Sequence, residues 1–124
     1  MDLENYKNQL DKFNENIKFD YDLKKKNWFN IGGKTKIFYK AENLKELIDF
    51  LKVINKNEKI FVLGSGSNTL VSDNIYDGVV IKLGKTFNNI SLHSDETIIA
   101  GAAVSDKSLS EFAMENSIVG LEFL

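Results

Sequence analysis

The stretch that most constrains the fold is IFVLGSGSNTLVSD, residues 60–73, in which an apolar run changes abruptly into glycines and serines. The run at residues 60–63 is rich in β-branched and aromatic side chains, which is typical of a buried parallel strand. Glycines placed straight after a strand permit positive φ and let another group approach the backbone closely. The pattern predicts a loop whose backbone N–H groups surround a phosphate, with a tight turn that binds nothing as the alternative.

Residues after this loop distinguish between kinds of phosphate-binding loop. The dinucleotide fingerprint G-x-G-x-x-G requires a third glycine, where this chain has Thr69, and a helix directly afterwards. The sequence instead continues TLVSDNIYDGVVIKL, which is typical of a turn and a strand. The GKT at residues 84–86 belongs to no P-loop, because Val79 occupies the position of that motif's first glycine. Neither of these two nucleotide motifs is therefore expected.

Three segments carry apolar residues at helical spacing. Asn43 and Glu46 form a capping-box pattern at the start of the middle segment, whose apolar stripe is expected to face the core. Ser105 and Asp106 mark the start of the last helix. The apolar positions are Leu3, Tyr6, Leu10 and Phe13 in a predicted N-terminal helix within residues 1–20, Leu44, Leu47, Ile48 and Leu51 in the middle helix, and Leu109, Phe112 and Ala113 in the last.

Strand patterns lie between and beyond these helices. They are expected at residues 35–40, 60–63, 78–83, 89–93 and 96–100. The resulting order of helix, strand, helix, strand, loop, three strands and helix predicts an α+β fold that contains a βαβ unit. The lysine run at residues 24–26 is expected on a solvated surface, with a phosphate contact as the alternative.

Composition excludes several kinds of site. The 124-residue chain has no cysteine, which excludes disulfides, thiolate catalysis and cysteine-ligated metals. All 16 basic residues are lysines, so no arginine is present to bind a phosphate with two parallel hydrogen bonds. The net charge of -2 gives no reason to expect a nucleic acid or an anionic membrane as partner. The charged start MDLENYKNQLDKF resembles no signal peptide, and no window reaches the ~18 apolar residues of a membrane span, so a cytoplasmic protein is expected.

Four ordered motifs carry a resemblance to a known family: NWFNIGG, LGSGSNTLVSD, GVVIKLG and AGAAVSDKSLSEFAMENSIVGLEFL. Together they resemble the N-terminal FAD-binding domain of the UDP-N-acetylenolpyruvoylglucosamine reductases, which has the PCMH or vanillyl-alcohol-oxidase type of fold. The resemblance implies an FAD-binding domain over residues 21–124, after the N-terminal helix. It also implies which residues bind the cofactor. These are Gly64, Ser65, Gly66, Ser67 and Asn68 around the diphosphate of FAD, and Gly101 and Ala102 in a segment that runs beside it.

Two other conspicuous residues are not expected in the site. Trp28 stands where the family commonly has threonine, and core packing is its expected role. His93, the single histidine, lies at the end of a predicted strand and is expected at the surface. Gly101 and Ala102 also have an alternative interpretation, as a strand end packed in the core.

The implied activity is a flavin-dependent reduction. In the family, NADPH reduces FAD, and the reduced flavin passes a hydride to the enolpyruvyl group of a UDP-sugar, giving UDP-N-acetylmuramate for peptidoglycan. The family's catalytic arginine, serine and glutamate lie beyond the GLEFL motif, so no catalytic residue is predicted in this chain. We therefore expect a C-terminally truncated domain without the substrate-binding domain, inactive by itself and prone to self-association through uncovered apolar surface.

The sequence leaves two alternatives open. One is the flavin domain of another PCMH-type oxidoreductase, acting on a small alcohol or hydroxy acid. The other is a non-catalytic remnant or partner-binding module, which would hold no flavin.

Overall fold

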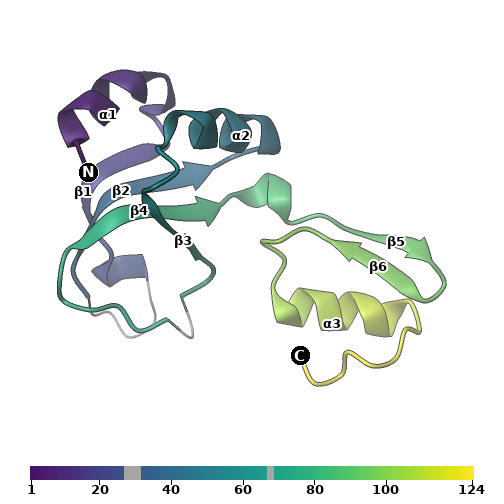
Figure 1. Ribbon diagram of the computed structural model, residues 1–124. Coiled ribbons are helices and arrows are strands. Elements are labelled where there is room, and N and C mark those ends of the chain that lie inside the picture. The colour runs from purple at the N-terminus through teal and green to yellow at the C-terminus, as the bar shows by residue number, and fades with distance from the viewer. Residues whose placement is uncertain (27–31, 67–68) are drawn as a thin grey trace. The chain divides into compact units, whose positions relative to one another are not determined.

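The chain forms two units, Met1–Leu83 and Gly84–Leu124, in the computed structural model, which describes residues 1–26, 32–66 and 69–124 (Figure 1). The first unit contains α1 (Leu3–Gln9), β1 (Ile17–Asp22), β2 (Lys34–Ala41), α2 (Leu44–Val53), β3 (Lys59–Leu63) and β4 (Tyr76–Leu83), with short 3-10 turns at Asp11–Phe13 and Lys24–Lys26. The second contains a 3-10 turn at Lys85–Phe87, then β5 (Ile90–Ser94), β6 (Thr97–Ala100) and α3 (Asp106–Glu115).

A four-stranded sheet in the order β1-β2-β4-β3 organises the first unit. Strands β2 and β3 both pair with β4 in parallel, whereas β1 pairs with β2 antiparallel. Helix α2 connects β2 to β3 across the intervening β4, which confirms the predicted α+β class and its βαβ unit. Because the three parallel strands end at the same edge, the loop that follows β3 emerges beside the ends of β2 and β4.

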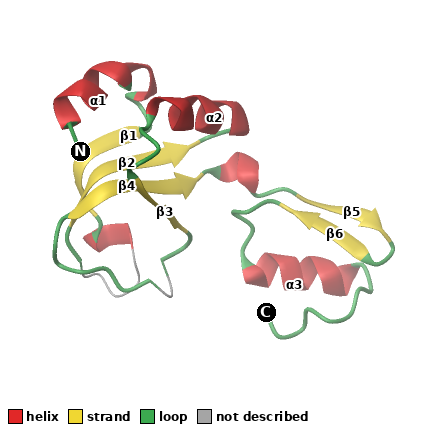
Figure 2. Cartoon of the chain, in the orientation of Figure 1, coloured by secondary structure: helices red, strands yellow, loops and turns green. Residues whose placement is uncertain are grey.

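Helices α1 and α2 cover one face of this sheet (Figure 2). Tyr39 of β2 stacks on Phe50 of α2 with ring centroids 3.9 Å apart, and Phe13 meets both rings edge-on at 5.7 Å. Leu10, which directly follows α1, is also fully buried. Aromatic rings in these arrangements stabilise a core beyond their buried area.

The opposite face of the sheet has a second apolar cluster. It consists of Leu23, Phe38, Leu63 and Val80, with Tyr21, Val71 and Tyr76 packed against it. Alternation along the strands explains the division, since Phe38 and Val80 occupy one face while their neighbours Tyr39 and Ile81 occupy the other. Leu63 and Val71 lie on either side of the glycine loop in sequence, so this second cluster supports the loop directly.

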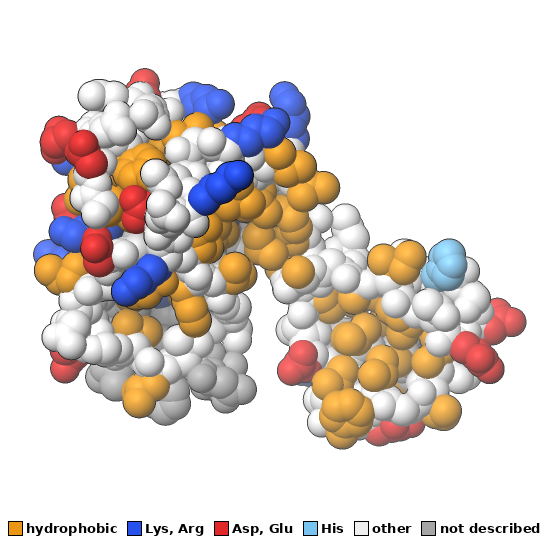
Figure 3. All heavy atoms as spheres, viewed as in Figure 1, with side chains coloured by type: hydrophobic (Ala, Val, Ile, Leu, Met, Phe, Trp, Pro, Cys, Tyr) orange, Lys and Arg blue, Asp and Glu red, His pale blue; other side chains and the backbone are white. Residues whose placement is uncertain are grey.

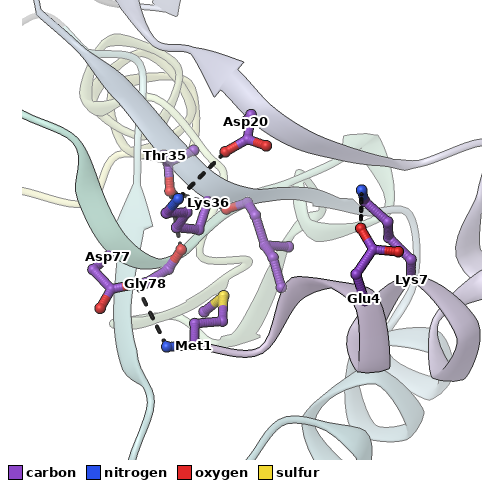
Figure 4. Close-up of polar contacts among 9 residues, drawn as sticks. Met1, Glu4, Lys7, Asp20, Thr35, Lys36, Asp77 and Gly78 are labelled. Carbon is purple, nitrogen blue, oxygen red and sulfur yellow. Dashed lines mark hydrogen bonds and ion pairs between the residues drawn. The ribbon is translucent and has the colours of Figure 1, made fainter.

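Polar contacts tie the strands of the first unit together (Figure 4). The buried hydroxyl of Thr35 lies 3.1 Å from the carbonyl oxygens of both Ile37 and Gly78, which links β2 to β4. Across the β1–β2 pair, the ammonium of Lys36 lies 3.7 Å from the carboxylate of Asp20. Asp20 has a φ of 48°, a left-handed conformation that aspartate tolerates better than most residues.

The second unit is a β-hairpin followed by a helix. Strands β5 and β6 pair antiparallel, and both lie where the sequence predicts them. The Ser105 hydroxyl caps α3 by accepting a hydrogen bond from the Ser108 amide at 3.1 Å, as the sequence also predicts. Ala113 of α3 is buried.

The predicted N-terminal helix within residues 1–20 is only partly correct. Helix α1 ends at Gln9, and Ile17–Asp22 form a strand paired with β2. Ile17 and Phe19 occupy alternate positions and pair with Tyr39 and Ile37 of β2. Partner strands far along the chain therefore decide the conformation of this segment, which local helical spacing cannot reveal.

The predicted orientation of α2 and the predicted burial of β3 are wrong. The cap is correct, since the Asn43 side chain accepts from the Glu46 amide at 2.9 Å. However, Leu44 of the expected apolar stripe is 61% exposed, whereas Phe50, outside that stripe, is fully buried. Strand β3 is parallel as predicted, but it lies at the sheet edge, where Phe61 and Val62 are 44% and 60% exposed.

Exposed apolar side chains occur on both units (Figure 3). The most exposed are Leu70 in the first unit and Met114, Val119 and Phe123 in the second. None of the helices in the described segments has the length and apolar content that a membrane crossing requires.

Candidate functional site

The glycine loop begins directly where β3 ends. Leu63 is buried in the second apolar cluster, Gly64 and Ser65 are exposed, and Gly66 is buried with a φ of 80°. That left-handed conformation strains any other residue, which explains the second glycine of the motif. Residues 69–75 contain no helix and lead straight into β4, as predicted, so the loop is not of the dinucleotide-fingerprint type.

No described atom of the protein crowds the first glycine of the loop. A Cβ placed on Gly64 would meet no described atom within 4 Å. Its carbonyl oxygen, in contrast, accepts a hydrogen bond from the ammonium of Lys82 at 2.8 Å. Gly64 is therefore not required by packing, which favours approach of a ligand as the reason for glycine here.

A double glycine from earlier in the chain supports the far side of the loop. The Gly33 amide donates to the carbonyl of Ser72 at 2.7 Å, and a Cβ on Gly33 would lie 2.5 Å from the backbone oxygens of Asp73 and Asn74. Gly32 has a φ of 127°, and a Cβ on Gly32 would lie 2.5 Å from the side chain of Val71. Both glycines are needed so that the segment after the loop can pack on the start of β2.

An apolar cavity of about 310 Å³ lies beside the loop. Its wall is formed by residues on both sides of the loop and by the second apolar cluster, mainly Leu23, Phe61, Leu63, Leu70, Val71, Tyr76 and Val80. Burial raises the pKa of Tyr76 above its ordinary value of 10.0. A polar loop next to an apolar cavity suits a ligand that has both a phosphate and an aromatic ring.

Lysines supply the positive charge near the loop. Lys82 pairs with Lys40 across β2 and β4, so both side chains lie on the loop face of the sheet. Lys26 lies on that face too, since its ammonium is 5.7 Å from the ring of Phe38. Burial, and then the charges of Lys26 and Lys40, lower the pKa of Lys82.

The second predicted segment belongs to the other unit. Gly101 donates its amide to the carbonyl of Asn89 at 2.8 Å, and a Cβ on Gly101 would clash with the carbonyl oxygen of Phe87. Packing alone therefore requires glycine there, whereas Ala102 is exposed. A cofactor contact by these two residues remains a prediction.

The other predicted positions complete the description of the site. Ser67, Asn68 and Trp28 lie outside the described residues. His93 is exposed on β5, as predicted. Within the described segments, no group of three or more histidine, aspartate or glutamate side chains could hold a metal ion.

Sequence reasoning missed two parts of this site. It did not identify Lys82, although a lysine between Ile81 and Leu83, at the end of an apolar run, is an unusual feature. Sequence reasoning noted the double glycine only as part of a motif. The packing of these glycines on residues 71–74 depends on the tertiary fold.

Comparisons with known proteins show which family the chain belongs to. The family model of an FAD binding domain matches residues 35–124. The UDP-N-acetylenolpyruvoylglucosamine reductase of Pelagibacter ubique is 55% identical over 124 residues, all of this chain and 41% of that protein. The enzyme of the same name from Rickettsia typhi is 44% identical over 107 residues, which are 86% of this chain and 36% of that protein.

A solved structure also matches. The crystal structure of UDP-N-acetylenolpyruvylglucosamine reductase from Thermus caldophilus superposes with a TM-score of 0.62 at 26% identity, covering 82% of this chain and 35% of that one. The chain thus spans about two-fifths of the length of the curated relatives it matches. The resemblance predicted from the sequence, and FAD as the cofactor of the family, are confirmed. Since the family model matches most of its residues, the chain belongs to the family of FAD binding domains.

Proposed function

We propose that this chain is the FAD-binding portion of an NADPH-dependent reductase that converts UDP-N-acetylglucosamine-enolpyruvate to UDP-N-acetylmuramate for peptidoglycan synthesis. The observation that carries the proposal is the glycine loop after β3, which lies beside an apolar cavity of about 310 Å³. The names of the relatives from Pelagibacter ubique and Rickettsia typhi support the reaction and its UDP-sugar substrate. In this proposal the protein acts in the cytoplasm, where NADPH and the UDP-sugar would be available to it.

The residues fit FAD in two respects. Backbone N–H groups of a loop that contains a positive-φ glycine can bind a diphosphate without any arginine, which this chain lacks. The neighbouring apolar side chains would take up one aromatic end of the dinucleotide and exclude water from it. Residues 64–68 would hold the diphosphate, with Gly101 and Ala102 as the second contact. FAD, when bound, supplies the hydride-transfer chemistry, and the protein supplies its binding and orientation.

Chemistry on the UDP-sugar is assigned to no residue of this chain. The proposal gives these 124 residues a binding role. Exposed apolar side chains such as Val119 and Phe123 support self-association of the isolated chain. Size-exclusion chromatography at several concentrations would detect it as a shift to earlier elution.

Two other functions are less well supported. The flavin domain of a different PCMH-type oxidoreductase would share the loop, but both curated relatives above are named for the enolpyruvyl reductase. A non-catalytic module would not need Gly64, since nothing described in the protein packs against that position.

Flavin retention tests the proposal. The chain is purified with added FAD, desalted, and examined for flavin absorbance beside the variants Gly66→Val and Asn68→Ala. Asn57→Ala is the matched control, because Asn57 is exposed in the turn before β3, at the opposite end of that strand. We expect the wild type and the control to retain FAD and the two loop variants to lose it. Equal retention by all four proteins, or retention by none, contradicts the proposal.

A further inference from the structure

The side chain of Lys82 contacts the described part of the glycine loop. It lies near the end of β4, where it pairs in register with Leu63, the last residue of β3. From there its Nζ reaches the carbonyl oxygen of Gly64 and donates a hydrogen bond of 2.8 Å. An ammonium on a carbonyl oxygen is a charge-assisted hydrogen bond, which is stronger than one between neutral groups.

The surroundings of Lys82 disfavour a charged ammonium group at this position. Lys40 lies directly opposite it on β2, and burial together with Lys40 and Lys26 disfavours the charged form. Lys40 has a different partner, since its ammonium lies 3.5 Å from the Glu42 carboxylate. A lysine held among other lysines, with its hydrogen bond directed to the loop, points to a requirement at the loop.

The Gly64 carbonyl is a potential obstacle to anion binding. A carbonyl oxygen that faced a bound diphosphate would repel it, whereas an oxygen held on an ammonium group is turned toward the lysine and partly neutralised. Since the peptide is trans, the N–H of Ser65 points away from the oxygen that Lys82 holds. Fixing this one oxygen therefore fixes the first peptide plane of the loop.

We propose that Lys82 is a positioning residue for diphosphate binding, which anchors the Gly64–Ser65 peptide in the orientation that the loop needs and places a positive charge next to it. The inference rests on the proposed function, because it takes the FAD diphosphate as the anion. It adds a role for a strand residue that lies 18 positions after the glycine it contacts.

Three variants test the role of Lys82. Lys82→Met removes the ammonium but keeps the aliphatic stem, Lys82→Arg restores a charged donor, and Lys40→Met removes an equal charge from the neighbouring register position without touching the loop. FAD affinity is measured by flavin fluorescence. Amide hydrogen exchange of Ser65 and Gly66 is measured by NMR in the flavin-free chain, with the amides of β4 as the internal reference for folding.

We expect Lys82→Met to weaken FAD binding roughly tenfold and to speed exchange of the two loop amides at least threefold, with β4 unchanged. Lys82→Arg should recover most of both losses, and Lys40→Met should leave loop exchange unaltered. If Lys82→Met and Lys40→Met weaken binding equally and neither alters loop exchange, the lysine acts through charge alone and the inference is overturned.

Failure of the proposed function gives a different result. If the wild-type chain binds no FAD, the proposed function fails, and the exchange of Ser65 and Gly66 still decides whether Lys82 positions the loop. Unaltered exchange in Lys82→Met overturns the positioning role in that case as well.

Discussion

The amide of Gly33 donates a hydrogen bond of 2.7 Å to the carbonyl oxygen of Ser72, and this bond joins the double glycine to the segment that follows the glycine loop. The double glycine and the glycine loop are about thirty residues apart in sequence. The two glycines leave room for the segment after the loop to pack against the start of β2. The loop is thus held from both sides, by Lys82 at Gly64 and by Gly33 at Ser72.

Gly33→Ala is expected to destabilise the first unit. The new Cβ would lie 2.5 Å from two backbone oxygens, so the segment at residues 72–74 must move. Overpacking of this kind costs about 1–3 kcal/mol. The change is measured by urea denaturation, and FAD affinity should fall with it because the loop loses its support. A variant as stable as the wild type would show that these two segments do not pack as described.

Gly64→Ala is expected to separate folding from binding. Since a Cβ at Gly64 would meet no described atom within 4 Å, the melting temperature should be unchanged within about 1 °C. FAD affinity should still fall by about tenfold, because the added methyl group obstructs approach of the diphosphate to the backbone. Unchanged affinity measured by flavin fluorescence would mean that the ligand does not approach this residue.

The orientation of α2 can be tested with two alanine substitutions on the same helix. Phe50→Ala removes a fully buried ring that stacks on Tyr39, and we expect a loss of about 3–5 kcal/mol in the free energy of unfolding. Leu44→Ala is the matched control, since Leu44 is 61% exposed and should cost less than about 1 kcal/mol. Comparable losses for the two variants, measured by chemical denaturation, would favour the apolar stripe that the sequence predicts.

Tyr39→Phe is expected to alter stability mainly at alkaline pH. Burial, and then the nearby carboxylates of Glu46, Glu42 and Asp49, raise the pKa of Tyr39 to about 12 from its ordinary value of 10.0. The folded pKa lies above the unfolded one, so the stability that the neutral phenol contributes is complete below pH 10.0 and is lost as pH rises toward about 12.

Within the described residues the Tyr39 hydroxyl has no hydrogen-bond partner, so its removal should change stability at pH 7 by no more than about 1 kcal/mol. The phenylalanine variant lacks the titrating group and should lose less stability than the wild type across that alkaline interval. Denaturation midpoints followed at neutral and alkaline pH measure this difference. Parallel pH profiles for the two proteins would show that Tyr39 does not titrate in the folded state as described.

Local sequence signals predicted the elements that depend on local chemistry. The caps at Asn43 and Ser105, the parallel strand before the glycines and the absence of a helix after them all follow from residues within a few positions. The glycine loop was predicted for the same reason, because glycine by itself permits the positive φ that Gly66 adopts.

The features that sequence reasoning missed depend on distant partners. Ile17–Asp22 form a strand because β2 offers an edge, and Leu44 is exposed because the aromatic core of Phe13 and Tyr39 turns the Phe50 side of α2 inward. Lys82 reaches Gly64 because β3 and β4 are neighbours in the sheet. None of these relationships has a local signature, so only the folded chain reveals them.

Binding of the FAD diphosphate by the glycine loop can be tested by an NMR titration of the chain with FAD, followed at the backbone amides. If the loop binds the diphosphate, the amides of Gly64, Ser65 and Gly66 should show the largest shift changes in the first unit, saturating together with the flavin fluorescence. Residues that line the apolar cavity, such as Val71 and Val80, should shift with the same dissociation constant. Saturable FAD binding that leaves these loop amides unshifted, or no binding at all, would show that the glycine loop does not bind the diphosphate of FAD.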